Sequence, residues 1–173
     1  MIKISNNILD NKTYKELQEI CKDFDNRDFK NIDEKNHNFY VRLFIKKEML
    51  MDYITNAKKY LIENLSYDKT NTVDFEDSIS WINKISTESN KDDDFHFDTS
   101  VLTLITYLND EYTGGEFIYI DENGNEKTIV PKPNMTLIMD NHLFHKVANV
   151  NSGIRFSLIT FLILKQKKNK SLI

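Results

Sequence analysis

Hydrophobic positions in the first part of the chain recur at the spacing of amphipathic helices. Between Thr13 and Asp25 they fall three or four residues apart, which predicts a helix with one buried stripe. Asn11 or the Asn6–Asn7 pair is the candidate N-cap of this helix. Lys47–Leu65 has the same spacing and predicts a longer helix. Between the two, Phe39–Ile45 is aromatic and β-branched, which predicts a strand.

From about Ser78 the helical spacing gives way to short apolar segments separated by turn residues. The Asn123-Gly124 step is a strong hairpin signal, and Pro131 and Pro133 fall between segments, where a missing N–H does little harm. Many short strands in series are typical of a sandwich or jelly roll, so we expect N-terminal helices packed against a C-terminal β-structure. The predicted strands are Ser78–Ser86, Val101–Leu108, Glu116–Asp121, Lys127–Val130, Met135–Met139, His145–Val150 and Ile154–Leu164.

Composition narrows the class of protein. A chain of 173 residues with 40% hydrophobic residues fits one globular domain. The single cysteine, Cys21, excludes a disulfide framework and any multi-thiolate metal site, which favours a reducing compartment such as the cytoplasm. We expect no membrane span and no secretory signal, because no apolar run is long enough. The net charge of −4 argues against a nucleic-acid partner.

Histidine and aspartate provide the first candidate chemistry. His96 and Asp98 form an H-x-D pair, and alternate residues of a strand share a face. With His145, 49 residues further on, they make two imidazoles and one carboxylate, the ligand set of a facial triad for Fe(II). A three-ligand zinc site would use the same residues, and an acidic loop without a metal is the simplest alternative for the H-x-D pair alone.

Arg155 adds a second element of chemistry. The chain has 20 lysines but only three arginines, and Arg155 opens a strongly apolar strand, where a buried guanidinium needs an anion. It follows His145 by ten residues across a predicted Val150–Gly153 turn. Two adjacent antiparallel strands would then bring His145 and Arg155 into one cavity. A surface ion pair is the alternative for this arginine.

Five segments together resemble the catalytic core of the 2-oxoglutarate- and Fe(II)-dependent oxygenases, and most of all their prolyl 4-hydroxylase-like branch. The resemblance covers about 70 residues and rests on the order and spacing of His96-Phe-Asp98, Thr106–Asp110 (TYLND), Gly114–Phe117 (GGEF), Leu143–Val147 (LFHKV) and Gly153–Leu158 (GIRFSL). It implies an α+β fold, a cupin-like jelly roll or double-stranded β-helix braced by N-terminal helices. We expect a single oxygenase domain over residues 1–173, with helical support over about 1–77, a catalytic core over about 78–165 and a basic tail over 166–173.

The resemblance also implies roles for individual residues. His96, Asp98 and His145 would ligate Fe(II), and Arg155 would pair with the distal carboxylate of 2-oxoglutarate. Two further residues, Tyr107 and Ser157, would add hydrogen bonds to the same carboxylate. His142 is the rival to His145, but it lies 13 residues from Arg155 and lacks the following Lys-Val. The expected cofactors are Fe(II) and 2-oxoglutarate, with ascorbate as reductant and O₂ as co-substrate.

The substrate is the least determined part of this prediction. The family implies C–H hydroxylation of a peptidyl proline, with a free amino acid or another small molecule as the alternative. A non-catalytic cupin-like metal module is a further alternative, although it needs no dicarboxylate anchor. Trp81–Phe95 lacks the Tyr- and Gly-bearing loop common in prolyl hydroxylases, and Trp81 lies either beneath the site or at its mouth. Phe161 stands where nucleobase-repair relatives carry a second arginine, which also disfavours nucleic acid.

Overall fold

The computed structural model describes residues 1–25, 41–64, 78–89, 94–100 and 102–162. Within these ranges the helical elements are α1 (Asn11–Asp25), η1 (Lys47–Leu50), α2 (Met51–Asn64) and η3 (Thr87–Ser89). The strands are β1 (Ile2–Ser5), β2 (Val41–Phe44), β3 (Ile79–Ser86), β4 (Leu102–Tyr107), β5 (Tyr112–Gly114), β6 (Phe117–Ile120), β7 (Glu126–Ile129), β8 (Thr136–Asp140), β9 (His145–Val147) and β10 (Val150–Leu162).

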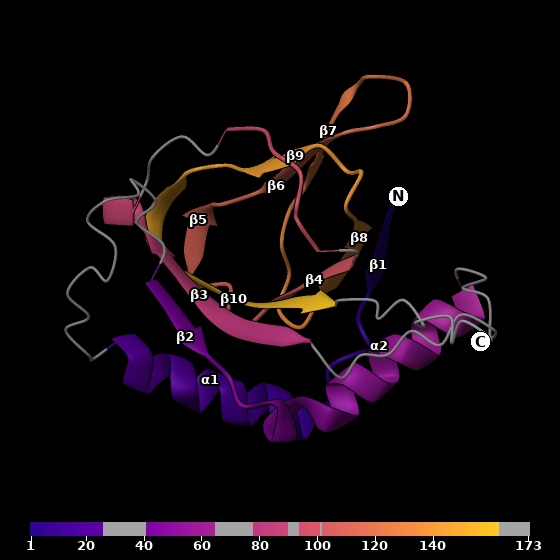
Figure 1. Ribbon diagram of the computed structural model, residues 1–173. Coiled ribbons are helices and arrows are strands. Elements are labelled where there is room, and N and C mark those ends of the chain that lie inside the picture. Colours follow the sequence, from indigo (N-terminus) through magenta and orange to yellow (C-terminus); the bar gives the residue numbers. More distant parts are fainter. Residues whose placement is uncertain (26–40, 65–77, 90–93, 101, 163–173) are drawn as a thin grey trace, which may run out of the picture.

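The strands form two antiparallel sheets that face each other (Figure 1). The larger sheet follows the order β1-β8-β4-β10-β3-β2, and β5 pairs with the first part of β10. The smaller sheet has the order β7-β6-β9. Helices α1 and α2 lie along the outer face of the larger sheet (Figure 1). The predicted α+β jelly roll with bracing helices is therefore confirmed.

Side-chain alternation along the larger sheet explains why both of its faces are covered. On β10, Phe156, Leu158 and Leu162 belong to the core that the sheet shares with the helices. Ile159, on the opposite face, packs with Trp81 and Phe117 in a second core between the two sheets. Because successive side chains of a strand point to opposite faces, the central strands β3, β4, β8 and β10 supply residues to both cores.

The predicted strands are confirmed to within a few residues, and two further strands escaped prediction. β1 and β5 have only four and three residues, too few to show a periodicity. The helix predicted over Lys47–Leu65 begins with a separate 3₁₀ turn, η1. Phe39, Tyr40, Leu65 and the tail over residues 166–173 lie outside the described residues.

The N-cap of α1 differs from the prediction. Asp10, rather than Asn11 or the Asn6–Asn7 pair, caps this helix: its carboxylate accepts hydrogen bonds from the backbone N–H groups of Lys12 and Thr13, each at 2.9 Å. Its other oxygen accepts the Thr13 hydroxyl at 2.7 Å. Two of the backbone donors that a helix N-terminus leaves unpaired are thereby satisfied.

The pairing predicted between the strands of His145 and Arg155 is wrong. His145 lies on β9, which pairs with β6, whereas β10 pairs with β3, β4 and β5. The expected turn over Val150–Gly153 is instead the first part of β10. At Gly153, where φ is +74°, the chain passes from its pairing with β5 to its pairing with β3. A side chain at this point would meet the carbonyl oxygen of Glu111, so glycine permits this change of pairing partner.

Candidate functional site

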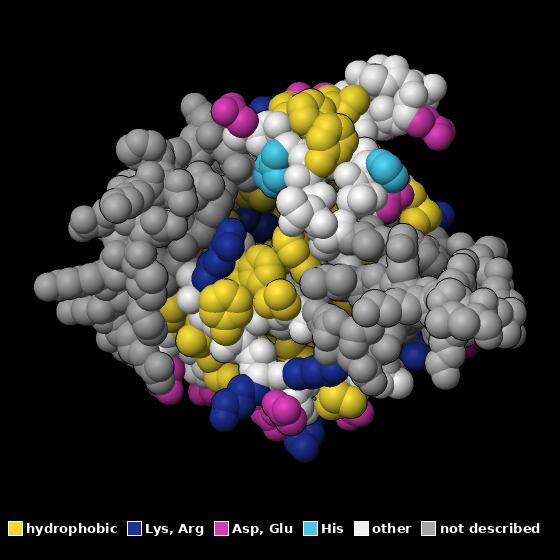
Figure 2. Space-filling view, viewed as in Figure 1, with side chains coloured by type: hydrophobic (Ala, Val, Ile, Leu, Met, Phe, Trp, Pro, Cys, Tyr) yellow, Lys and Arg dark blue, Asp and Glu magenta, His cyan; other side chains and the backbone are white. Residues whose placement is uncertain are grey.

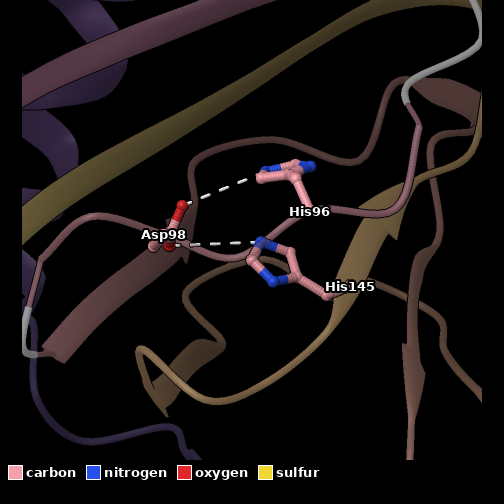
Figure 3. A group of neighbouring side chains, drawn as sticks. All are labelled: His96, Asp98 and His145. Carbon is pink, nitrogen blue, oxygen red and sulfur yellow. Dashed lines mark ion pairs between the residues drawn. The ribbon is translucent and has the colours of Figure 1, made fainter.

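His96, Asp98 and His145 meet at one end of the space between the sheets. One ligand atom from each lies within 4.8 Å of the others, and Figure 3 shows the three side chains pointing toward one another. The Nε2 atoms of His96 and His145 lie 3.9 and 4.0 Å from the two oxygens of Asp98. The spacing of the three groups suits one cation in contact with all of them.

Backbone pairing places the two histidines side by side. The N–H of His96 donates to the carbonyl of His145 at 2.8 Å, and the N–H of His145 donates to the carbonyl of His96 at 3.0 Å. This isolated antiparallel bridge puts both side chains on the same face. The H-x-D pair therefore lies on a loop that is tied to β9 at one residue, rather than on a regular strand.

Hydrogen bonds to the backbone set the tautomer of both imidazoles. His96 Nδ1 lies 2.9 Å from the carbonyl of Asp94, and His145 Nδ1 lies 2.9 Å from the carbonyl of Leu143. A carbonyl only accepts, so each Nδ1 carries a proton, and in the neutral imidazole each Nε2 then presents a lone pair toward Asp98. This tautomer is the one in which a histidine ligates a metal through Nε2.

The remaining contacts of the cluster hold Asp98 and His145 in position. Asp98, with a side chain only 12% exposed, accepts the Thr103 hydroxyl at 2.6 Å. The ring of Phe117 stacks on the imidazole of His145 at a centroid distance of 5.1 Å. His96 is more open, with 43% of its side chain exposed. Two of the three groups are thus fixed by packing, and the third faces the mouth of the site.

Arg155 lies in the same cavity and is 1% exposed. Its guanidinium carbon is 5.0 Å from the ring centroid of Tyr107, and the register of β10 with β4 sets Ser157 opposite Tyr107. Three atoms here are buried without a hydrogen-bond partner among the described residues: Arg155 Nε, Tyr107 Oη and Ser157 Oγ. No ion pair within the described ranges involves Arg155. Leaving a buried donor unpaired costs about 1–3 kcal/mol, so this cluster is suited to an anionic ligand.

Burial raises the pKa of Tyr107 to about 12, even though the charge of Arg155 acts in the opposite direction. The phenol therefore keeps its proton at neutral pH and can donate it in a hydrogen bond. The pKa of Tyr112 is raised for the same reason, again against the charge of Arg155. Both tyrosines remain neutral beside the guanidinium, which leaves its positive charge available to a ligand.

Two residues that support Arg155 were not identified as functional from the sequence. The Asn109 side chain donates to the carbonyl of Ile154 at 2.7 Å and accepts the N–H of Phe156 at 2.8 Å, so it holds β10 on both sides of Arg155. Gly115, with φ of +69°, leaves room for the arginine, since a Cβ there would lie 2.9 Å from Arg155 Cδ. Both lie in segments, TYLND and GGEF, that the sequence analysis used only for the resemblance to the oxygenase family.

The cavity that joins the two clusters has a volume of about 480 Å³. Figure 2 shows it as a hollow whose walls carry hydrophobic side chains, a histidine and basic side chains. Trp81 lines this cavity and is buried. His142 is exposed and is not part of the cluster around Asp98. His37, Asp92 and Asp93 lie outside the described residues.

Residues 81–163 match the sequence model of the family described as the 2OG-Fe(II) oxygenase superfamily. This match covers 83 of the 173 residues of the chain, including the metal trio and Arg155, and makes the chain similar to this superfamily over that segment. Its cofactors are accordingly Fe(II) and 2-oxoglutarate, and the site contains groups that suit each of them. Two imidazoles and a carboxylate suit the metal, while the unpaired buried donors around Arg155 suit a carboxylate.

Solved structures of 2OG-Fe(II) oxygenases share this fold. A prolyl-4-hydroxylase from Pseudomonas putida aligns with a TM-score of 0.69 at 13% identity, over 95% of this chain and 93% of that one. A prolyl hydroxylase from Trichoplax adhaerens, in complex with a hypoxia inducible factor peptide fragment, aligns at 0.67 and 14% identity, over 94% and 83%. A dioxygenase for auxin oxidation from Arabidopsis thaliana, bound to 2-oxoglutarate, aligns at 0.65 and 18% identity, over 95% and 84%.

A comparison with curated protein sequences gives no match. Among the helices that the structure describes, none is long and apolar enough to cross a membrane.

Proposed function

We propose that this oxygenase holds Fe(II) through His96, Asp98 and His145 and anchors the distal carboxylate of 2-oxoglutarate on Arg155, Tyr107 and Ser157. One observation carries the proposal: the metal-ligating trio lines the same cavity as Arg155 and Ser157, whose buried donors are unpaired, and the unpaired hydroxyl of Tyr107 belongs to the same buried cluster. A metal module without turnover would have no use for the second cluster. The two clusters together account for both ends of a chelating dicarboxylate.

When bound, Fe(II) and 2-oxoglutarate use O₂ to hydroxylate a C–H bond, and 2-oxoglutarate leaves as succinate and CO₂. The residues of the chain bind and orient the reactants, and they exclude water from them. Arg155 supplies a fixed charge and a fork that suits a carboxylate, and neutral Tyr107 donates a hydrogen bond to it. The apolar side chains of Ile105 and Ile159 line the cavity and limit the water near the reacting groups.

We propose a peptidyl proline as the substrate, with prolyl 4-hydroxylation as the reaction. The support is an aromatic cluster beside the metal trio: Phe144 stacks with Phe95 at a centroid distance of 5.2 Å and contacts Phe97 at 4.8 Å. Phe97 lines the cavity and is 55% exposed, which is unusual for a phenylalanine. Proline-rich segments dock on aromatic surfaces of this kind, because their extended conformation is already formed before binding.

The test is the release of succinate from 2-oxoglutarate by purified protein supplied with Fe(II), O₂ and ascorbate as reductant. We expect a proline-containing peptide to raise the rate and to gain 16 Da, while the same peptide with alanine for proline does neither. Asp98→Ala should abolish the release, because it removes one of three metal ligands. Folded, iron-loaded protein that neither binds 2-oxoglutarate nor releases succinate would refute the oxygenase assignment. Release that no proline peptide stimulates would refute only the substrate.

A further inference from the structure

A second arginine lines the same cavity and has no role in the site described so far. Arg42 lies on β2, the edge strand of the larger sheet, directly opposite Asn83 on β3. Both line the cavity, together with Trp81. Two of the chain's three arginines, Arg42 and Arg155, therefore face one cavity in a protein that otherwise relies on lysine for its positive charge.

The guanidinium of Arg42 contacts an aromatic ring but has no anionic partner among the described residues. Its central carbon lies 5.1 Å from the ring centroid of Trp81, within the distance of a cation–π contact. None of the hydrogen bonds or ion pairs between described residues involves Arg42, and Asp94, which also lines the cavity, makes no ion pair with it. Arg42 is exposed and lines the cavity, so its N–H donors are open to a ligand.

Asn83 presents further donors beside Arg42. The indole N–H of Trp81 donates to Asn83 Oδ1 at 2.7 Å. An indole nitrogen only donates, so the atom that faces it must be the amide oxygen, and the orientation of the amide is fixed. The NH₂ group of Asn83 is thereby directed away from Trp81, and no hydrogen bond within the described residues uses it. Trp81 thus contacts two neighbouring groups, one charged and one neutral, that can only donate.

We propose that Arg42 and the Asn83 amide bind a carboxylate of the substrate, while Trp81 packs against its apolar part. Donors without acceptors on adjacent strands match the two oxygens of a carboxylate, and a guanidinium binds it in a fork. This carboxylate is distinct from that of 2-oxoglutarate, because the cluster around Arg155 is fully buried whereas Arg42 is exposed at the mouth. This inference rests on the proposed oxygenase function, because the carboxylate belongs to the substrate of that reaction.

The carboxylate that binds Arg42 and Asn83 could come from two kinds of substrate. An aspartate or glutamate next to the target proline of a peptide carries a carboxylate, and so does a free carboxylic acid of low molecular mass. Two matched pairs separate them: a proline peptide with flanking Asp or Glu against its Asn or Gln counterpart, and N-acetylproline against N-acetylprolinamide. A response to the first pair alone identifies a side-chain carboxylate, and a response to the second pair identifies a free acid.

The first measurement compares kcat/KM for succinate release within each pair. We expect the carboxylate-bearing member of at least one pair to be favoured by about tenfold or more, in line with a charge-assisted hydrogen-bonded pair. Arg42→Gln should remove that preference and Arg42→Lys should restore part of it. Lys12→Gln removes the same charge on α1, on the far side of the sheet, and should leave the preference intact. Equal rates within both pairs for the wild-type protein would overturn the inference.

A second measurement does not depend on turnover. Trp81 is the only tryptophan in the chain, so selectively excited tryptophan fluorescence reports on this site alone. Titration with the same compounds under argon, without 2-oxoglutarate, should change the emission only for the carboxylate-bearing members, and Arg42→Gln should abolish the change. If succinate is never released but the fluorescence discriminates, the carboxylate site stands and the oxygenase proposal fails. If the fluorescence is indifferent to charge, the carboxylate site is refuted whatever the turnover.

Discussion

At the scale of single residues, the site depends on imidazoles whose orientation is set by backbone carbonyls. His145 meets this requirement through the carbonyl of Leu143, and it is buried against Phe117. His142, three residues earlier, is exposed, and only its backbone N–H is fixed, by Asp140 at 3.1 Å. The two histidines are therefore a matched pair of the same residue type in very different surroundings.

His145→Ala should abolish iron binding and turnover, whereas His142→Ala should largely preserve both. Changes to groups that only orient a ligand cost about 10–100-fold in metal affinity, so loss of a ligand itself should cost more than about 100-fold. Anaerobic titration with Fe(II), followed by calorimetry, measures the affinity of each variant. The reverse pattern, with iron lost from the His142 variant, would contradict the proposed ligand set.

The residues that would bind the cofactors could be predicted from the sequence, but the residues that hold them in position could not. Histidine, aspartate and a scarce arginine can be identified by their chemistry and spacing. Asn109, Gly115 and Arg42 could not be identified in the same way, because their importance depends on contacts between distant segments. The register of β2 with β3 is one example: it alone brings Arg42 to the cavity.

At the scale of elements, the first helix provides a direct test of a capping interaction. Asp10→Ala should lower the free energy of unfolding by about 1 kcal/mol at pH 7, as is typical for an N-cap. Hydrogen bonds from Thr13 hold the pKa of the Asp10 carboxyl below its ordinary value of 3.8. A lowered pKa means that the charged form stabilises the fold above about pH 4 and that this contribution is lost as the pH falls through the native pKa.

Urea unfolding of both proteins at pH 7, 5 and 3 measures this effect. The difference between wild type and Asp10→Ala should be constant from pH 7 to 5 and shrink below pH 4. Asp10→Asn is the control, because it keeps a capping oxygen that does not titrate. A difference that stays the same at pH 3 would show that the carboxylate charge contributes nothing to the cap.

Helices and strands were predicted best where they are long enough to show a regular spacing of hydrophobic residues. α1, α2 and β4 have enough residues to show a period of 3.6 or a continuous apolar run, whereas β1 and β5 do not. The sequence predicts a turn between two strands at Gly153, where the structure has one continuous strand, because a glycine after Asn-Ser is compatible with both. Only the pairing of β5 with β10 distinguishes them.

At the scale of the whole molecule, the two sheets bring together residues that the chain keeps far apart. The metal trio comes from a loop and from β9, and the arginine comes from the middle of β10, yet all face one cavity. The central claim is that this cavity holds 2-oxoglutarate between the metal trio and Arg155. That claim concerns binding and can be tested apart from any substrate.

The most direct test is calorimetric titration of 2-oxoglutarate into iron-loaded protein under argon. Arg155→Ala should weaken 2-oxoglutarate binding by about 30-fold or more, the loss expected for a charged, bidentate hydrogen bond, and should change the affinity for Fe(II) by less than about twofold. Arg155→Lys should recover only part of the binding, because it keeps the charge but not the fork. Unchanged 2-oxoglutarate affinity in Arg155→Ala, or binding that does not require the metal, would contradict the account.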